Sequence, residues 1–316
     1  MNTMGRIEIK VQQLYSSVDE YINQGSMGRH ETFTPRYGWL KKGFDAVLKD
    51  PNIFKAVDAI ERLGVGKNMV SSIRFWCQAF KLIRPNREGG YEPTKLGEKL
   101  LGESGWDRYL EDEASLWLLH WQLFLPSLEG VSWSLAFNKC NLLSFNIKEL
   151  ARVIKNHAQK YHRFATVSEK SFERDASCII RMYYGSSDKD SEIDCPFTQL
   201  GLIRKADEKN YVSFNTAEKA TLPPLIYAAV CFSYLANYVS SGQKTILLSR
   251  LTYDFNSPGA VFKLPESTVG NYLSRALDEL NIDGVTITDS LGSQLHFTGV
   301  AEDLYWLALK KYYEEQ

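Results

Sequence analysis

The feature that most constrains the fold is the order of helix and turn patterns in residues 30–101. The first apolar residues of this stretch recur at helical spacing and predict a helix with one buried stripe, formed by Trp39, Phe44, Val47 and Leu48. A second, short helix is expected over residues 58–63, and Gly64-Val65-Gly66 then supplies a tight turn. The short helix and the turn form a helix-turn-helix motif if the next segment is also helical.

That next segment has the pattern of an amphipathic helix. Its expected buried side is formed by Val70, Ile73, Trp76, Cys77 and Phe80. Its opposite side is expected to present Lys67, Asn68, Ser71, Arg74, Phe75 and Gln78. A helix that begins after a tight turn, with cations and hydrogen-bond donors on its open face, is suited to the major groove of DNA.

A β-hairpin and a closing helix complete the pattern. Residues 82–84 and 91–93 flank the turn-forming residues 86–90, and Thr94 is placed to cap the closing helix. Helices followed by such a hairpin predict a winged helix-turn-helix, a nucleic-acid-binding module, over residues 28–105.

Each residue type on the open face of the third helix suggests a kind of DNA contact. Arg74 suits guanine, Asn68 suits adenine and Lys67 suits phosphate, with Ser71 and Gln78 as further hydrogen-bonding groups. The DNA contact surface is also expected to include cations from the segment before the third helix and from the hairpin, namely Arg36, Lys41, Lys42, Arg84 and Arg87. The alternative is that this face packs against another helix or a partner protein.

Charge is distributed unevenly along the chain. The net charge of −1 excludes a uniformly basic surface, so contact with a polyanion requires a local patch. Residues 29–105 contain 14 Lys and Arg against 9 Asp and Glu, a balance of +5, which the remainder of the chain offsets with −6. This asymmetry suggests that the first module faces a polyanion.

Cysteine usage and hydropathy bear on the compartment. The cysteines are scattered and form no CxxC pair: Cys77, Cys140, Cys178, Cys195 and Cys231. This is typical of reduced core thiols and not of a zinc site or a disulfide framework. The longest apolar run, residues 225–239, is interrupted by Ser233 and Asn237 and is too short to span a bilayer. The first residues carry charges within their apolar pattern, unlike a signal peptide. We therefore expect a soluble, cytoplasmic protein without membrane contact.

The whole chain is expected to be mainly α with small β-hairpins, an α+β protein. An amphipathic helix is predicted in residues 1–27, and a helical connector in residues 106–165. Helix followed by hairpin recurs twice, which predicts a second winged-helix-like unit plus an apolar helix over residues 166–240, and a third such unit over residues 241–316. The predicted helices after residue 105 span residues 106–124, 132–138, 147–161, 168–184, 247–253 and 265–280.

A second candidate site lies before the first helix. His30 and Glu31, close to Arg36, could form a phosphate or metal site in which His30 is an acid, base or ligand and Glu31 is a base. The alternative is a lead-in loop in which Glu31 or Thr32 caps the helix and Arg36 pairs with an acidic core residue. No paired carboxylates at nuclease spacing, no HExxH motif and no Ser/His/Asp order accompany these residues.

Two weaker patterns carry no site assignment. Gly64-Val65-Gly66-Lys67 is not a Walker A loop, because Glu61 stands where that loop has a glycine and Asn68 replaces its Ser or Thr. The basic run around His162 and Arg163 is more typical of a solvated helix end than of a catalytic group. We expect no organic cofactor.

Two runs of this sequence, GRHETFTPRYGWLKKGFDAV and LGVGKNMVSSIRFWCQAFKLI, are similar to the bacterial family that includes SspB, the B component of Ssp DNA phosphorothioation systems. The resemblance extends over residues 28–101. It implies a cytoplasmic antiphage defence protein that works with a cysteine desulfurase, an ATPase and a sulfur-transferring enzyme to replace a non-bridging phosphate oxygen by sulfur.

Within such a system, the resemblance implies that this component engages double-stranded DNA and nicks one strand. The residues that match the family motifs are His30, Glu31, Arg36, Lys67 and Asn68. If nicking occurs, Mg²⁺ or Mn²⁺ is the expected helper, since a divalent ion stabilises the leaving oxygen. Two alternatives stay open: a non-catalytic winged-helix adaptor or regulator that recruits partner proteins to DNA, and a transcription repressor that binds one palindromic site.

Overall fold

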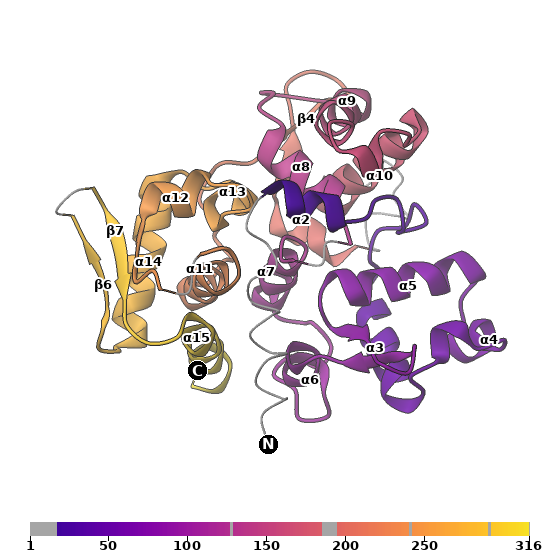
Figure 1. Ribbon diagram of the computed structural model, residues 1–316, viewed down its shortest axis with the longest axis horizontal. Coiled ribbons are helices and arrows are strands. Elements are labelled where there is room, and N and C mark those ends of the chain that lie inside the picture. The colour runs from indigo at the N-terminus through magenta and orange to yellow at the C-terminus, as the bar shows by residue number, and fades with distance from the viewer. Residues whose placement is uncertain (1–17, 127–128, 185–194, 240–241, 290–291, 316) are drawn as a thin grey trace.

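The computed structural model describes residues 18–126, 129–184, 195–239, 242–289 and 292–315 (Figure 1). Within these residues the chain is mainly helical, and its strands form small antiparallel sheets with the orders β1-β2, β3-β4 and β5-β7-β6. The predicted fold class, helices with small β-hairpins, is confirmed at this level. Of the predicted N-terminal helix, residues 1–17 lie outside the described residues, and α2 (Val18–Gln24) packs Tyr21 and Ile22 into the core.

The helices predicted between residues 30 and 80 are present with small shifts of their ends. They are α3 (Trp39–Lys49), the 3-10 helix η1 (Ile53–Lys55), α4 (Ala59–Leu63) and α5 (Lys67–Ala79). Two side-chain assignments are wrong. Leu48 is exposed, and Phe75, expected on the open face of α5, is buried against the ring of His30. The loop that precedes α3 covers this side of α5, which helical periodicity does not reveal.

Helix α3 lies very close to α5, and a glycine allows the approach. A Cβ at Gly43 would lie 2.6 Å from Cys77 Sγ and 2.7 Å from Ile73 Cγ2, so any larger residue would push the helices apart. The predicted tight turn after α4 is also present, since Gly64 has a φ of 63° and ends that helix in the left-handed region.

The predicted hairpin and closing helix follow α5. Their bounds are β1 (Ile83–Pro85), β2 (Tyr91–Pro93) and α6 (Lys95–Leu101). Arg84 pairs with Glu92 across the two strands. Thr94 caps α6 as predicted, because its side chain accepts a hydrogen bond from Gly97 N at 3.0 Å.

Helix α7 (Glu113–Gln122) lies at the centre of the molecule, between the N-terminal helices, the α8–α10 group and the C-terminal part (Figure 1). Trp117, Trp121 and His120 are fully buried on its different sides. His120 Nε2 donates a hydrogen bond to Val261 O at 3.0 Å, and its Nδ1 is hydrogen-bonded to the Tyr183 hydroxyl at 2.7 Å. The predicted start of this helix near residue 106 is wrong. Asp107 instead accepts hydrogen bonds from two following backbone amides, which folds residues 107–112 into turns.

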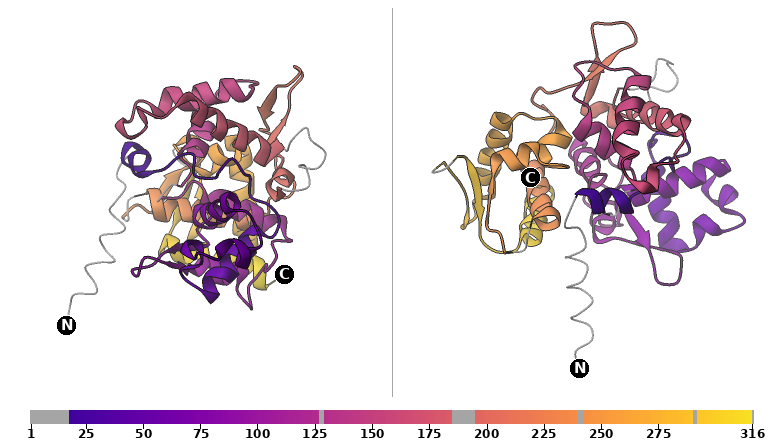
Figure 2. Two further views of the ribbon diagram at one scale, coloured as in Figure 1. Left: turned by 90° about the vertical axis from the view of Figure 1, so that its right-hand side faces the viewer. Right: turned by 45° about the horizontal axis from the view of Figure 1, so that its top comes forward.

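The next group contains α8 (Val131–Lys139), α9 (Ile147–Ala158), the 3-10 helix η2 (His162–Phe164), α10 (Glu169–Tyr184), the 3-10 helix η3 (Pro196–Leu200), β3 (Ile203–Lys205) and β4 (Val212–Phe214). A reciprocal capping box between Asn146 and Glu149 fixes the start of α9. Helices α9 and α10 pack against each other, and Figure 2 places them above the N-terminal helices.

The C-terminal part contains α11 (Pro224–Tyr238), β5 (Thr245–Leu247), α12 (Leu248–Tyr253), α13 (Pro258–Phe262), α14 (Glu266–Leu280), β6 (Val285–Thr288), β7 (Gln294–Phe297) and α15 (Ala301–Glu314). The apolar α11 is covered by α14 and α15. The predicted hairpin is present, but the sequence did not reveal β5, which pairs with β7. No helix among the described residues is long and apolar enough to cross a membrane.

Candidate nucleic-acid interface

The predicted contact residues of α5 form one stripe. Lys67, Ser71, Arg74 and Gln78 are spaced four, three and four residues apart, which places them on one side of the helix. Lys67 and the neighbouring Asn68 are exposed, while Ser71, Arg74 and Gln78 are half-buried. The stripe exists because the other sides of α5 are taken up by the core. It presents cations, an amide and a hydroxyl, the groups that bind phosphates and base edges.

The supporting cations from α3 and its lead-in are partly engaged within the protein. Lys41 forms an ion pair with Asp45 at 2.5 Å, and Lys42 donates a hydrogen bond to Leu63 O at 3.0 Å. The guanidinium of Arg36 lies over two aromatic rings, 5.7 Å from the centre of Phe33 and 5.4 Å from that of Trp39. These three residues therefore contribute mainly to the local positive potential, because their charged groups already contact other groups of the protein.

The two hairpin arginines lie on the exposed side of the hairpin. Arg84 forms an ion pair with Glu92 at 2.7 Å, and both side chains are exposed. Arg87 lies in the turn and is exposed as well. An exposed pair of this kind contributes little to stability, so Arg84 can exchange Glu92 for another anion at small cost.

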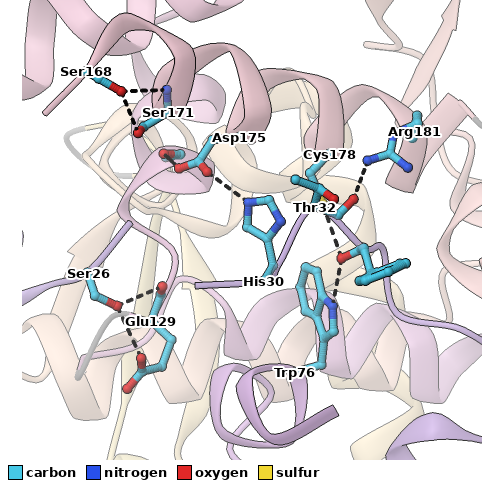
Figure 3. Close-up of polar contacts among 12 residues, drawn as sticks. Ser26, His30, Thr32, Trp76, Glu129, Ser168, Ser171, Asp175, Cys178 and Arg181 are labelled. Atoms are coloured by element: carbon cyan, nitrogen blue, oxygen red, sulfur yellow. Dashed lines mark hydrogen bonds and ion pairs between the residues drawn. The ribbon is translucent and has the colours of Figure 1, made fainter. Parts of the chain in front are cut away.

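His30 lies in the interior. Its side chain is almost completely buried, and Nε2 lies 2.8 Å from Oδ1 of Asp175 on α10 (Figure 3). The other carboxylate oxygen of Asp175 accepts a hydrogen bond from the Ser132 hydroxyl of α8. Burial opposes the charged imidazole, but Cys178 and Asp175 favour it, and the net effect raises the pKa of His30 to about 10. His30 is therefore a charged residue that links the N-terminal segment to α8 and α10.

The backbone after His30 is held on both sides (Figure 3). Phe33 O accepts hydrogen bonds from Trp76 Nε1 of α5 at 3.1 Å and from Cys178 Sγ of α10 at 3.5 Å. Thr32 O accepts one from the guanidinium of Arg181. Residues 30–33, the anchored loop, therefore join α5 to α10.

Glu31 occupies the outer position of the anchored loop. Its side chain is exposed, and its φ of 50° is in the left-handed region, as is the φ of 67° at Thr32. Neither residue caps α3, since the N-cap is Gly38 without a side-chain hydrogen bond, so that part of the alternative reading is wrong. A non-glycine residue with a left-handed backbone conformation costs free energy and persists only where surrounding contacts hold it. Here the hydrogen bonds of the loop hold Glu31 and Thr32 in that conformation.

The structure also brings to this loop a group of side chains that the sequence analysis did not single out. Thr32 lines an open depression together with Arg174, Ser177 and Arg181 of α10. The signal was present in the sequence, because Lys170, Arg174, Ser177 and Arg181 repeat the spacing of the α5 stripe. The basic run that did attract notice, around His162, instead forms the short helix η2 beyond the end of α9.

The described side chains do not identify a metal position. Among them no group of three or more His, Cys, Asp and Glu residues is arranged to hold a metal ion. Mg²⁺ is often held by one or two carboxylates with water completing its shell, and the geometry does not select such carboxylates here. We therefore assign no residue of this chain to a metal.

The described elements define a mainly helical protein in which small antiparallel hairpins follow groups of helices and cationic stripes lie beside an anchored loop. The family described as a protein of unknown function (DUF4007) matches residues 27–313, so the chain belongs to this family.

Two solved structures of SspB are similar to this chain. One is a magnesium ion-bound SspB crystal structure, with 32% identity, a TM-score of 0.86 and coverage of 93% of this chain and 90% of the other. The second is an SspB crystal structure with the same identity and coverages and a TM-score of 0.84. The resemblance inferred from the sequence is thereby confirmed, and it extends well beyond residues 28–101. No curated protein matches the chain.

Proposed function

We propose that this chain is a DNA-binding, strand-nicking component of a bacterial Ssp DNA phosphorothioation system. The observation that carries the proposal is the similarity to SspB, at 32% identity over 93% of this chain. In this role it would act in the cytoplasm with a cysteine desulfurase, an ATPase and a sulfur-transferring enzyme. A nick would give the modifying partners access to one strand.

We interpret the N-terminal segment as a winged helix-turn-helix, with α5 as the recognition helix and the β1–β2 hairpin as the wing. The order of three helices, hairpin and closing helix supports this interpretation. By the same reasoning, α10 with β3–β4, and α12 and α14 with the β5-β7-β6 sheet, are two further winged-helix-like units. The domain boundaries that follow are those given by the sequence, at residues 28, 106, 166 and 241.

The α5 stripe is the proposed DNA contact. Lys67 at its exposed start is assigned to a phosphate, and Asn68 and Arg74 to base edges, where Asn suits adenine and Arg suits guanine. Ser71 and Gln78 supply further hydrogen bonds. The hairpin arginines are assigned to the flanking backbone, and the engaged cations of α3 and its lead-in to the surrounding potential: Arg84, Arg87, Arg36, Lys41 and Lys42.

We assign nicking to the anchored loop. Glu31 faces solvent and is the proposed base that takes a proton from the attacking water. His30 is the proposed acid that gives a proton to the leaving oxygen. It is buried, so this role requires the loop to leave α10 and break the Thr32–Arg181 and His30–Asp175 contacts. Mg²⁺ or Mn²⁺ is the proposed helper, because one similar SspB structure contains magnesium.

Conversion of supercoiled plasmid to open circles tests the proposal. The pure protein is incubated with Mg²⁺, Mn²⁺ or EDTA, beside the variant Glu31→Gln. Glu31 is exposed, so this substitution leaves the fold intact, whereas removal of His30 would strand the buried Asp175. Glu103→Gln, at another exposed site, is the matched control. We expect nicking by the wild type and the control with metal, and its loss in Glu31→Gln. A plasmid that stays supercoiled with the wild type would exclude nicking.

The second candidate function is a non-catalytic adaptor that recruits partner proteins to DNA. Two observations favour it: His30 is buried, and the described residues contain no preformed metal-binding group of three or more side chains. DNA binding without nicking in the plasmid assay would support this function.

A further inference from the structure

Helices α9 and α10 each carry a row of cations, and the two rows lie side by side. On α9, Lys148, Arg152 and Lys155 are spaced four and three residues apart. On α10, Lys170, Arg174, Ser177 and Arg181 are spaced four, three and four residues apart. The helices pack through their buried apolar sides, which leaves both rows at the surface. We call these seven residues the α9–α10 surface.

The α9–α10 surface is concave. One open depression of about 410 Å³ is lined by Thr32, Lys170, Arg174, Ser177 and Arg181, among others. A second of about 110 Å³ is lined by Lys148, Arg152 and Lys155. Both depressions include Glu173, so they adjoin each other. A continuous strip therefore leads from the anchored loop across α10 to α9.

The charge of this strip is strongly positive. Its six cations face two carboxylates, Glu169 and Glu173, and of these Glu169 is paired with Lys155 at 3.4 Å. Residues 146–184 contain 8 Lys and Arg against 4 Asp and Glu, a balance of +4, so the rest of the chain carries −5 of the total of −1. The remaining two acidic residues are used internally: Glu149 caps α9 and Asp175 is buried with His30.

We infer that the α9–α10 surface is a second DNA-binding site, which holds the phosphate backbone of the duplex whose other part contacts α5. This inference rests on the proposed DNA binding and adds a second contact surface to it. The row on α10 extends over about 16 Å, roughly five steps of 3.4 Å along one strand. Lys, Arg and Ser side chains without amide groups are suited to phosphates and carry little base information.

DNA fits this surface better than an acidic protein does. Protein interfaces are centred on buried aromatic or apolar anchors, and charged residues are depleted there. Of the residues lining the two depressions, Ile147 is the one large apolar side chain that is exposed. A regular polyanion needs no such anchor, because its binding is driven by charge neutralisation and counterion release.

The position of this surface gives it a role in nicking. Thr32 belongs to the anchored loop and also lines the larger depression. The carbonyl of the following residue, Phe33, accepts a hydrogen bond from Trp76 of α5. The loop therefore lies between the two DNA-binding faces. A duplex held by both would pass over Glu31, and the α9–α10 surface would fix the strand on the far side of the proposed nick.

The test is the salt dependence of duplex binding by the full chain. The double variant Arg152→Gln/Arg174→Gln removes two exposed charges from the strip. We expect an affinity loss of roughly tenfold or more and a slope of log K against log salt smaller by about 2, at about 0.9 per phosphate contact. The charge-matched control Lys310→Gln/Lys311→Gln, on α15 at the opposite end of the molecule, should bind like the wild type. Glu173→Gln should bind severalfold tighter, a gain that a damaged fold cannot produce.

The outcomes separate this inference from the proposed function. Wild-type affinity in Arg152→Gln/Arg174→Gln, beside weaker binding in Lys67→Ala/Arg74→Ala, would overturn the α9–α10 site and leave DNA binding intact. No duplex binding by the wild type would overturn both. Weaker binding in the α9–α10 variant alone would support the second site and exclude the recognition role of α5. Tighter binding of polyglutamate than of duplex DNA, lost in the α9–α10 variant, would assign the surface to an acidic protein instead.

Discussion

The α5 stripe and the α10 row have the same spacing, yet they present different chemistry. Lys67, Ser71, Arg74 and Gln78 mix charge with an amide and a hydroxyl, and Asn68 adds a second amide. The α10 row joins the cations of α9 in a concave strip with few neutral donors. Mixed donors suit base edges, whereas clustered charge suits phosphates. The comparison suggests that one face selects the DNA sequence and the other holds the backbone, with the anchored loop between them.

The largest expected effect comes from breaking the link between the two faces. Asp175→Ala should lower the free energy of unfolding by about 3–5 kcal/mol, since it leaves the charged His30 buried without its partner. Asp278→Ala, at an exposed site on α14, should stay within about 0.5 kcal/mol of the wild type. Urea unfolding measures both. Equal stability of the two variants would mean that the loop is held by other contacts.

The same link should make stability depend on pH. The pKa of His30 is raised from 6.5 to about 10 in the folded chain. Because the folded pKa is the higher one, the stabilisation is full below pH 6.5 and is lost as pH rises to 10, a fall on the order of a few kcal/mol. Urea unfolding of wild type and His30→Gln across this range isolates the effect. A wild-type curve parallel to that of His30→Gln would contradict it.

Base selectivity should distinguish the two faces. Arg74→Ala is expected to reduce discrimination between duplex sequences by about 1–3 kcal/mol, because a bidentate contact with a base is lost. Arg174→Gln is expected to weaken all sequences alike. Binding of both variants to a pool of random duplexes, followed by sequencing, measures this. An equal loss of affinity for all sequences in Arg74→Ala would mean that both faces contact the DNA backbone and not the bases.

The smallest effect is expected at the start of α5. Lys67→Ala should reduce the salt slope of duplex binding by about 1, as for one phosphate contact, and should leave the sequence preference unchanged. Lys244→Ala, on the C-terminal part, is the control. An unchanged slope in Lys67→Ala would remove this residue from the footprint.

Local patterns predicted much of the fold. The spacing of apolar residues located α5, the glycine turn located its start, and Thr94 marked the start of α6. These features depend on neighbours a few residues apart. The wrongly predicted start of α7 near residue 106 also has a local cause, since the Asp107 carboxylate accepts hydrogen bonds from the following amides. Turns of this kind compete with helix formation, and the spacing of apolar residues does not show which of the two forms.

The candidate sites were less predictable because they depend on distant parts of the chain. His30 was grouped with its sequence neighbours Glu31 and Arg36, but its partner Asp175 is 145 positions away. Phe75 was assigned to the open face because the loop that covers it belongs to no periodic element. The α10 row had a visible spacing, but its concavity requires α9 and Thr32 beside it. Sequence patterns show faces of single helices and not the surfaces that several elements form together.

The most direct test of the central claim, that one duplex contacts both faces across the loop, combines the two charge variants. Salt slopes are measured for wild type, Lys67→Ala/Arg74→Ala, Arg152→Gln/Arg174→Gln and the fourfold variant on one long duplex. We expect the Lys67→Ala/Arg74→Ala pair to lower the slope by about 1, because Arg74 is assigned to a base, and the Arg152→Gln/Arg174→Gln pair to lower it by about 2. The fourfold variant should lose the sum of the two, about 3, at about 0.9 per phosphate contact. A fourfold variant with the slope of either pair alone would contradict simultaneous contact by both faces.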